Sequence, residues 1–180
     1  MLLLAGCATE THEPDVLRPA AKPPVYRSAV PSTDPRPPAA RCLDPGVEIS
    51  IGDGDAATGL RFIGITLRNC GTRPYTVKGY PAVTLLDAGQ RTLPVRVVYG
   101  VDHVSLMPPY DKPPQRLVLA PGQTARAVVV WRNLTTDEAT IVNGEYLRVA
   151  GARGQPTHLL ALHVDLGNTG ILALSPWAMS

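Results

Sequence analysis

Apolar and polar residues alternate in short runs from residue 42 onward, and Gly, Pro, Asn and Asp separate the runs. Such alternation is typical of β-strands that turn one face toward a core. Because turn signals recur about every 8 to 12 residues and no long amphipathic helix is predicted, we expect an all-β fold, an antiparallel β-sandwich of about eight or nine strands. The predicted strands cover residues 47–51, 63–67, 83–86, 93–99, 116–119, 125–131, 146–149, 158–164 and 171–174.

Clusters of turn-forming residues mark the predicted connections. The Gly-Asp-Gly-Asp sequence at 52–55 predicts a turn, and Asp-Ala-Gly at 87–89 predicts a hairpin connection whose glycine is available for positive φ. Pro121-Gly122 predicts a type II turn. One short helical turn is expected at residues 136–141.

The first seven residues form an apolar run that ends in Leu4-Ala5-Gly6-Cys7. Small residues directly before a cysteine are typical of a bacterial lipobox, where the chain is cleaved and the cysteine is acylated. Only six residues precede Cys7, so we expect residues 1–7 to be the remnant of a lipoprotein signal peptide, which normally has a charged region and about 7 to 15 apolar residues. Cys7 is the predicted lipidation site, with more than one lipid chain for stable anchoring. A buried N-terminal strand is the alternative.

Residues 8–41 contain 8 of the 19 prolines and almost no apolar periodicity. Such a segment cannot bury enough surface to offset the entropy lost on ordering. We therefore expect a disordered proline-rich linker, with a fully extended reach of about 100 Å, between a lipid anchor and a β-sandwich domain at residues 42–180. A proline-rich ligand for a partner domain is the alternative.

The odd number of cysteines, three in all, agrees with this division. Lipidation of Cys7 leaves Cys42 and Cys70 as an even pair outside the cytoplasm, where a disulfide persists. A bridge between them would close a loop of about 29 residues and contribute about 3 to 4 kcal/mol of stability. Two independent buried thiols are the alternative.

Several short motifs add a resemblance to a known family. They are Ala57-Thr58-Gly59, Asn69-Cys70-Gly71, Gly79-Tyr80-Pro81-Ala82-Val83, Asp87-Ala88-Gly89 and Leu119-Ala120-Pro121-Gly122-Gln123. With the lipobox and the linker, they make the chain from Cys42 to Trp177 resemble the family called domain of unknown function 4232. The resemblance implies an immunoglobulin-like β-sandwich in a secreted or lipid-anchored actinobacterial protein, and it implies no activity. Members often carry a second cysteine pair in the C-terminal half, whereas residues 71–180 contain no cysteine.

Charge and motif content exclude several classes of function. The formal net charge is +2, from 17 basic and 15 acidic residues, so we expect no nucleic-acid partner. The sequence contains no G-x-S-x-G, H-E-x-x-H, P-loop or dinucleotide fingerprint, so we expect neither an enzyme nor a cofactor. His158 and His163 are five residues apart on one predicted strand and point to opposite faces, so no metal site is predicted from them.

The longest predicted connection, residues 100–115, is the strongest candidate for binding. Two Pro-Pro pairs stiffen it, and long loops on a rigid scaffold often carry function. The candidate binding residues in it are His103, Met107, Tyr110 and Lys112. The alternative is a crossover between sheets in which the prolines prevent edge pairing.

These expectations give one main hypothesis and two rivals. The main hypothesis is a non-enzymatic binding or interaction module of the cell envelope, held by its lipid on the extracytoplasmic face of the cell membrane, with an envelope protein or a small molecule as its partner. The first rival is a small-molecule or metal-handling lipoprotein, because His103 and Met107 are soft ligands that suit copper. The second is a hydrolase, which requires a titratable pair in a cleft.

Overall fold

Strands and two 3-10 helices make up the computed structural model, which describes residues 42–180. The predicted lipidation site Cys7 and the predicted linker at 8–41 lie outside the described residues. The elements, in chain order, are β1 (Val47–Ala57), β2 (Leu60–Asn69), β3 (Tyr75–Lys78), β4 (Ala82–Leu86), β5 (Arg96–Tyr99), η1 (Val101–His103), β6 (Arg116–Leu119), β7 (Thr124–Arg132), η2 (Glu138–Thr140), β8 (Val142–Ala150), β9 (His158–Gly167), β10 (Ile171–Leu174) and β11 (Ala178–Met179).

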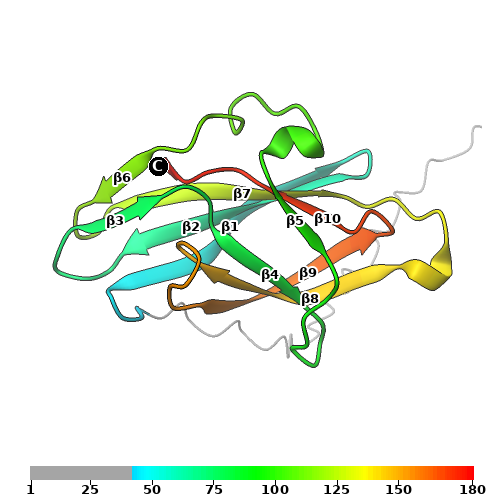
Figure 1. The fold of residues 1–180 in the computed structure, drawn as a ribbon, viewed down its shortest axis with the longest axis horizontal. Helices are drawn as coiled ribbons and strands as arrows, with labels where there is room; N and C mark the ends of the chain where they lie inside the picture. Colours follow the sequence, from blue (N-terminus) through cyan, green and yellow to red (C-terminus); the bar gives the residue numbers. More distant parts are fainter. Residues whose placement is uncertain (1–41) are drawn as a thin grey trace, which may run out of the picture. The chain divides into compact units, whose positions relative to one another are not determined.

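The strands form three sheets. The large sheet has the order β1-β2-β7-β10-β5, and β11 also pairs with β7. A three-stranded sheet has the order β4-β8-β9, and a two-stranded sheet joins β3 to β6. Figure 1 shows the long strands β1, β2 and β7 running side by side. All these strand pairs are antiparallel except β10 and β5, which run parallel.

The main core lies between one face of the large sheet, called here the inner face, and the other two sheets. From the large sheet, Ile49, Ile65 and Val129 are fully buried in it. From the other two sheets, Leu119 and Leu147 are fully buried as well. Alternate residues of each strand supply this core, as the period of two predicts. The predicted all-β, immunoglobulin-like β-sandwich is therefore confirmed, with one parallel strand pair within it.

The predicted turn at 52–55 is wrong. Strand β1 continues through these residues to Ala57, and its register with β2 shifts between Ile51 and Gly54. The turn lies at Thr58 and Gly59, whose φ angles of 49° and 75° are both positive, as a two-residue hairpin loop of type I′ requires. Glycine and aspartate at 52–55 therefore mark a β-bulge inside the strand, because a bulge accepts the same residues as a turn.

Three smaller expectations also change. The strands β3 and β11 were not predicted, and the strand expected at 93–99 is shortened to β5. In the turn after β4, Gln90 has the positive φ of 59°, whereas Gly89 does not. The type II turn at 121–122 is confirmed, with Gly122 at a φ of 83° and a hydrogen bond from Gln123 N to the carbonyl oxygen of Ala120.

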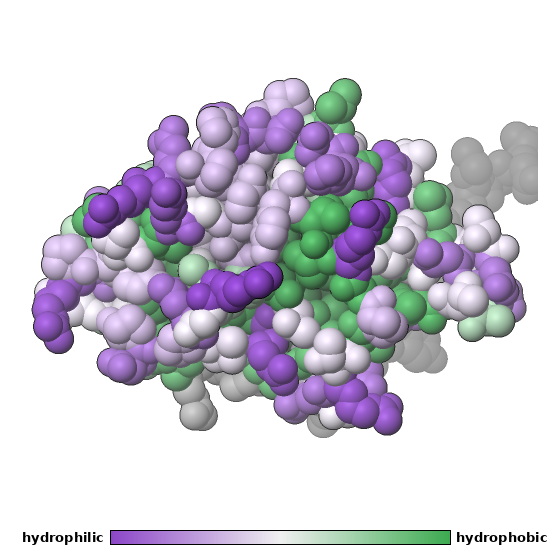
Figure 2. All heavy atoms as spheres, viewed as in Figure 1, coloured by the Kyte–Doolittle hydropathy of each residue, from purple (hydrophilic) through white to green (hydrophobic). Residues whose placement is uncertain are grey.

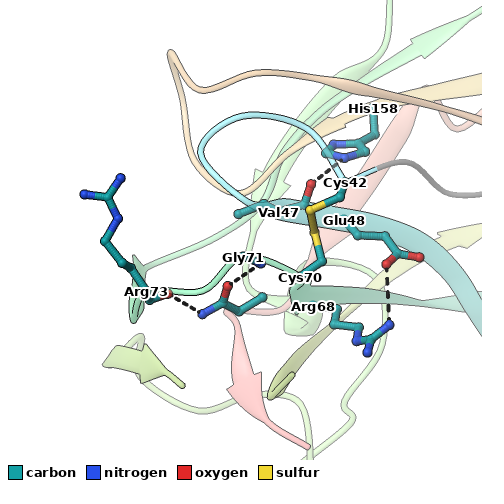
Figure 3. Close-up of a disulfide and its surroundings, with 9 residues drawn as sticks. Cys42, Val47, Glu48, Arg68, Cys70, Gly71, Arg73 and His158 are labelled. Carbon is teal, nitrogen blue, oxygen red and sulfur yellow. Dashed lines mark hydrogen bonds and ion pairs between the residues drawn. A yellow bond between two sulfur atoms is a disulfide. The ribbon is translucent and has the colours of Figure 1, made fainter. Parts of the chain in front are cut away.

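The predicted disulfide between Cys42 and Cys70 is present, with the two Cα atoms 5.9 Å apart. It joins the start of the described chain to the residue that follows β2 (Figure 3). Beside it, Nε2 of His158 lies 3.2 Å from the carbonyl oxygen of Val47. The buried side chain of Asn69 hydrogen-bonds to three backbone groups of neighbouring segments. This end of the sandwich is therefore held by a covalent bond and by buried polar contacts.

Candidate functional site

The connection between β5 and β6, residues 100–115, packs on the outer face of the large sheet, which is the face turned away from the main core. Val101 is fully buried there, and it belongs to a second apolar cluster with Val128, Val130 and Ala173 of the sheet. Side chains from the connection, including Met107, pack against this cluster. Figure 1 shows the segment from β5 through η1 to β6 as the green trace along the large sheet. The connection is therefore a packed cover, which we call the covering loop.

Strand β7 explains why the outer face accepts a cover. Its residues from Ala127 to Trp131 are buried on both faces of the sheet. A run of consecutive apolar residues is typical of a strand with both faces covered, whereas a strand with one wet face alternates. This run was visible in the sequence, and it is the signal that could have predicted apolar packing on the outer face.

A pair of aromatic rings fixes the middle of the covering loop. The centroids of Phe62 and Tyr110 are 6.2 Å apart, with the ring planes tilted by 42°. Such a pair contributes about 0.5 to 1.5 kcal/mol beyond the apolar area that it buries. Two hydrogen bonds support it: Tyr110 N donates to the carbonyl oxygen of Met107 at 2.8 Å, and Nε of Arg132 donates to that of Val104 at 3.2 Å.

Beyond this ring pair the loop does not cover the sheet, and a hollow of about 580 Å³ remains. Its walls come from four parts of the chain: the strands β1 and β2, the end of the covering loop, β7, and the segment 175–180. The lining side chains that matter below are Phe62, Thr66, Tyr110, Lys112, Arg126 and Val128.

Two glycines on adjacent strands, Gly52 and Gly64, leave room for the hollow. A Cβ atom at Gly52 would lie 3.5 Å from the carbonyl oxygen of Gly64 and from Oγ1 of Thr66, which is ordinary contact. A Cβ atom at Gly64 would lie 3.1 Å from the carbonyl oxygen of Asp53, which is too close without a shift. Two neighbouring strands therefore carry no side chain at this point, which lies beside the bulge in β1.

Comparison with known families then shows to which protein family the chain belongs. The model of the family described as Domain of unknown function (DUF4232) matches residues 42–178. The chain belongs to this family. No curated protein matches the chain. Among the described residues of the DUF4232 domain, no helix is long and apolar enough to cross a bilayer.

The DUF4232 domain brings only some of the predicted binding residues together. Tyr110 and Lys112 line the hollow. Met107 is partly buried against the second apolar cluster. His103 is exposed at the end of η1 and is not part of the lining. The sequence-based choice of the loop stays a prediction, and it did not include Arg126, which lines the same hollow from β7.

A polar cluster around Asp165 joins the two layers of the DUF4232 domain at another place. Its carboxylate accepts hydrogen bonds from Trp131 at 3.0 Å and from Asn133 at 2.6 Å, and it forms an ion pair with Arg61 at 3.2 Å. Burial acts to raise the pKa of Asp165, but these two hydrogen bonds and the charge of Arg61 outweigh it and hold the pKa below its usual value. The cluster therefore stabilises the ionised carboxylate and acts as a structural clasp.

A second polar contact lies between Tyr75 and the segment after β8. The hydroxyl group of Tyr75 donates to Oε1 of Gln155 at 2.6 Å. Burial raises the pKa of this hydroxyl above its usual value, and the hydrogen bond opposes the increase. Neither group lines the hollow, so we assign this contact to packing.

Apolar side chains also reach the surface around β5 and β10, as the green area in Figure 2 shows. Strand β5 is one of the two edge strands of the large sheet, and Val97 of this strand is partly buried against the main core. Leu93 and Val95, just before it, pack in the same way. Completion of the core therefore accounts for this area, whereas it does not account for the hollow.

Proposed function

We propose that this protein is a non-enzymatic binding module, which a lipid on Cys7 holds at the extracytoplasmic face of the cell membrane, and that the hollow beside the covering loop is its binding site. The observation that carries the proposal is the hollow itself. Its volume of about 580 Å³ lies within the range of roughly 300 to 1,000 Å³ that is usual for small-molecule sites. The packed loop and the glycines at 52 and 64 form it.

The lining supports binding more than catalysis. Its hydroxyl groups include Ser175, whose Oγ accepts from Val128 N at 2.9 Å and donates to the carbonyl oxygen of Pro176 at 3.1 Å. The lining contains no histidine or cysteine, and Asp53 is its one carboxylate side chain. A hydrolytic site needs a nucleophile beside a base that is itself held in place. This arrangement is not found among the residues that line the hollow.

The predicted location has independent support from cysteine chemistry. Disulfides persist mainly outside the cytoplasm, and Cys42 and Cys70 form one. An exported domain behind an acylated cysteine agrees with this bond. We do not extend the proposal to a metal-handling role, because residues 42–180 hold no group of three or more His, Cys, Asp and Glu side chains that could bind a metal ion.

The lipid anchor is tested by the Cys7→Ser variant expressed in an actinobacterial host with an alkyne-tagged fatty acid. We expect the parent chain to carry the label and to sediment with membranes, and the variant to lack the label and to appear in the soluble exported fraction. Equal labelling of both chains would contradict lipidation at Cys7.

The binding site is tested by photo-crosslinking in the cells that make the protein. A benzoylphenylalanine replaces Thr66, which lines the hollow, and in a control chain it replaces Thr76, an exposed threonine of β3. We expect a defined adduct, measured as a mass increase, at position 66 and not at position 76. The adduct should disappear when Gly52→Leu fills the hollow. The same adducts at both positions would remove the hollow as the binding site.

A further inference from the structure

We propose that the hollow binds a small amphipathic anion, with the anionic group beside Arg126 and Lys112 and the apolar body directed toward Phe62. This inference rests on the proposed function, because it names the chemistry of the ligand for the same site. It is carried by the order of side chains along the outer face of the large sheet and by the charges in the lining.

The pairing of β2 with β7 places three pairs of side chains in a row on the outer face. Phe62 lies opposite Val130, Gly64 lies opposite Val128, and Thr66 lies opposite Arg126. The row therefore passes from an apolar pair, through a pair that leaves space, to a polar pair with a positive charge. From Phe62 to Thr66 the strand rises by roughly 13 Å. A ligand that follows this row needs an apolar end and a charged end.

The apolar end of the row is already dry. Val130 is fully buried beneath the covering loop and does not line the hollow, whereas Val128, which is 5% exposed, lines it together with the rings of Phe62 and Tyr110 that pack on the same cluster. Burying apolar ligand surface against these side chains favours a complex. A fully hydrated inorganic ion would leave this part of the hollow unused, which is why we infer a ligand with an apolar body.

The polar end of the row carries the positive charge of Arg126, and a second cation lines the same hollow. Arg126 comes from β7 and Lys112 from the covering loop, and both line the hollow, as does the carboxylate side chain of Asp53. Within residues 42–180, neither cation forms an ion pair, whereas Arg61, Arg68 and Arg91 do. Both cations are therefore available to an anion, and a guanidinium can donate two parallel hydrogen bonds to a carboxylate.

The experiment is a titration of the full chain carrying Cys7→Ser, uniformly labelled with ¹⁵N, followed by NMR. Three probes separate the parts of the proposal: octanoate, octylammonium with the same apolar chain and the opposite charge, and acetate without the apolar chain. We expect octanoate to shift the amide signals of residues 62–66 and 126–128 and to bind about tenfold more tightly than either other probe, because octylammonium lacks the charge attraction and acetate lacks the apolar contact.

Matched variants test the named residues. We expect Arg126→Gln together with Lys112→Gln to weaken octanoate binding about tenfold, and Asp53→Asn to strengthen it about twofold, because each change alters the charge beside the anion. Arg153→Gln is the control, since Arg153 is an exposed arginine outside the lining. Circular dichroism of each variant checks that the fold is unchanged.

The outcomes separate this inference from the proposed function. Equal binding of octanoate and octylammonium at the hollow would show that the ligand need not be an anion. Unchanged affinity of the Arg126 and Lys112 double variant for octanoate would show the same. Either result leaves the hollow as a binding site. The inference of an amphipathic anion would also be overturned if the amide NMR signals of the residues at the hollow responded to none of the three probes. If octanoate binds as expected but position 66 gives no adduct in cells, the proposed function fails while the chemistry of the site stands.

Discussion

The two faces of the large sheet are built from the same strands but are covered differently. The inner face meets two other sheets, and its residues such as Ile65 and Val129 are fully buried. The outer face meets a single loop, which packs over Val130 and ends beside a hollow. A sheet covers the whole length of a strand, whereas a loop covers only the part on which its side chains lie. The incompletely covered face is therefore where a ligand can enter without opening the core.

Neighbouring valines on β7 allow this comparison to be measured. Val129 belongs to the main core and Val128 to the second apolar cluster. We expect Val129→Ala to lower the free energy of unfolding by about 2 to 3 kcal/mol and Val128→Ala by about 1 kcal/mol, because water can reach the space that the second change leaves, while the first leaves an enclosed cavity. Urea unfolding of both variants measures the difference. Equal losses would mean that the two faces are equally well sealed.

The attachment of the covering loop is tested next, with a smaller expected effect. Tyr110→Ser removes the ring that packs on Phe62, and we expect a loss of about 1 to 2 kcal/mol together with faster amide hydrogen exchange at residues 101–110. Leu106→Ser is the control in the same loop, because Leu106 is 83% exposed; it should change stability by less than about 0.5 kcal/mol. The same exchange rates in both variants would show that the ring pair does not hold the loop.

The smallest effect concerns the Asp165 clasp, which lies on the inner side. The pKa of Asp165 is lower in the folded protein than in the unfolded chain. The ionised carboxylate therefore contributes its full stabilisation well above pH 4, and this stabilisation is lost as the pH falls through the lowered pKa of the folded state. We expect Asp165→Asn to lower stability by about 1 kcal/mol or less at pH 7. We also expect this substitution to reduce the fall in the free energy of unfolding between pH 5 and pH 2, which is about the range in which carboxyl groups titrate.

Urea unfolding at a series of pH values measures how the free energy of unfolding depends on pH in the parent chain and in the variant. Asp87→Asn serves as a comparison, since the pKa of Asp87 is also lowered, chiefly by the hydrogen bond from the backbone N–H of Arg91. Part of the loss of stability at low pH should therefore persist in the Asp165→Asn variant, because Asp87 still contributes to it. Superimposable pH profiles of the parent chain and the Asp165 variant would contradict the assignment of the clasp.

Local patterns were sufficient to predict most of the sandwich. Alternation located nine of the strands approximately, and the cysteine count predicted the bridge between Cys42 and Cys70. Residues 52–55 were misassigned because their glycines and aspartates suit a turn and a bulge equally well. Only the pairing of β1 with β2 decides between the two. Strand β3 was missed for a similar reason, because four residues become a strand only through their pairing with β6.

The hollow was less accessible to prediction than the fold. Tyr110 and Lys112 were chosen because their loop is long and rich in proline, and both line the hollow. Arg126 could not be chosen in this way, since its role depends on the register that sets it opposite Thr66. The space itself depends on Gly52 and Gly64 lying on neighbouring strands. Their pairing follows from the turn at Thr58 and Gly59, which the sequence analysis did not locate.

The disulfide has a mechanical consequence for a domain pulled by its N-terminal side. Because Cys42 is bonded to Cys70, tension applied at Cys42 passes through the sulfur atoms to the residue after β2 and bypasses the segment between them. Strand β1 is the edge strand at the other side of the large sheet from β5. Without the disulfide, it would be the first strand to be pulled off the sheet. The covalent shortcut therefore leaves residues 43–69, which include the bulge and the glycines beneath the hollow, free of load while the rest of the chain is under tension.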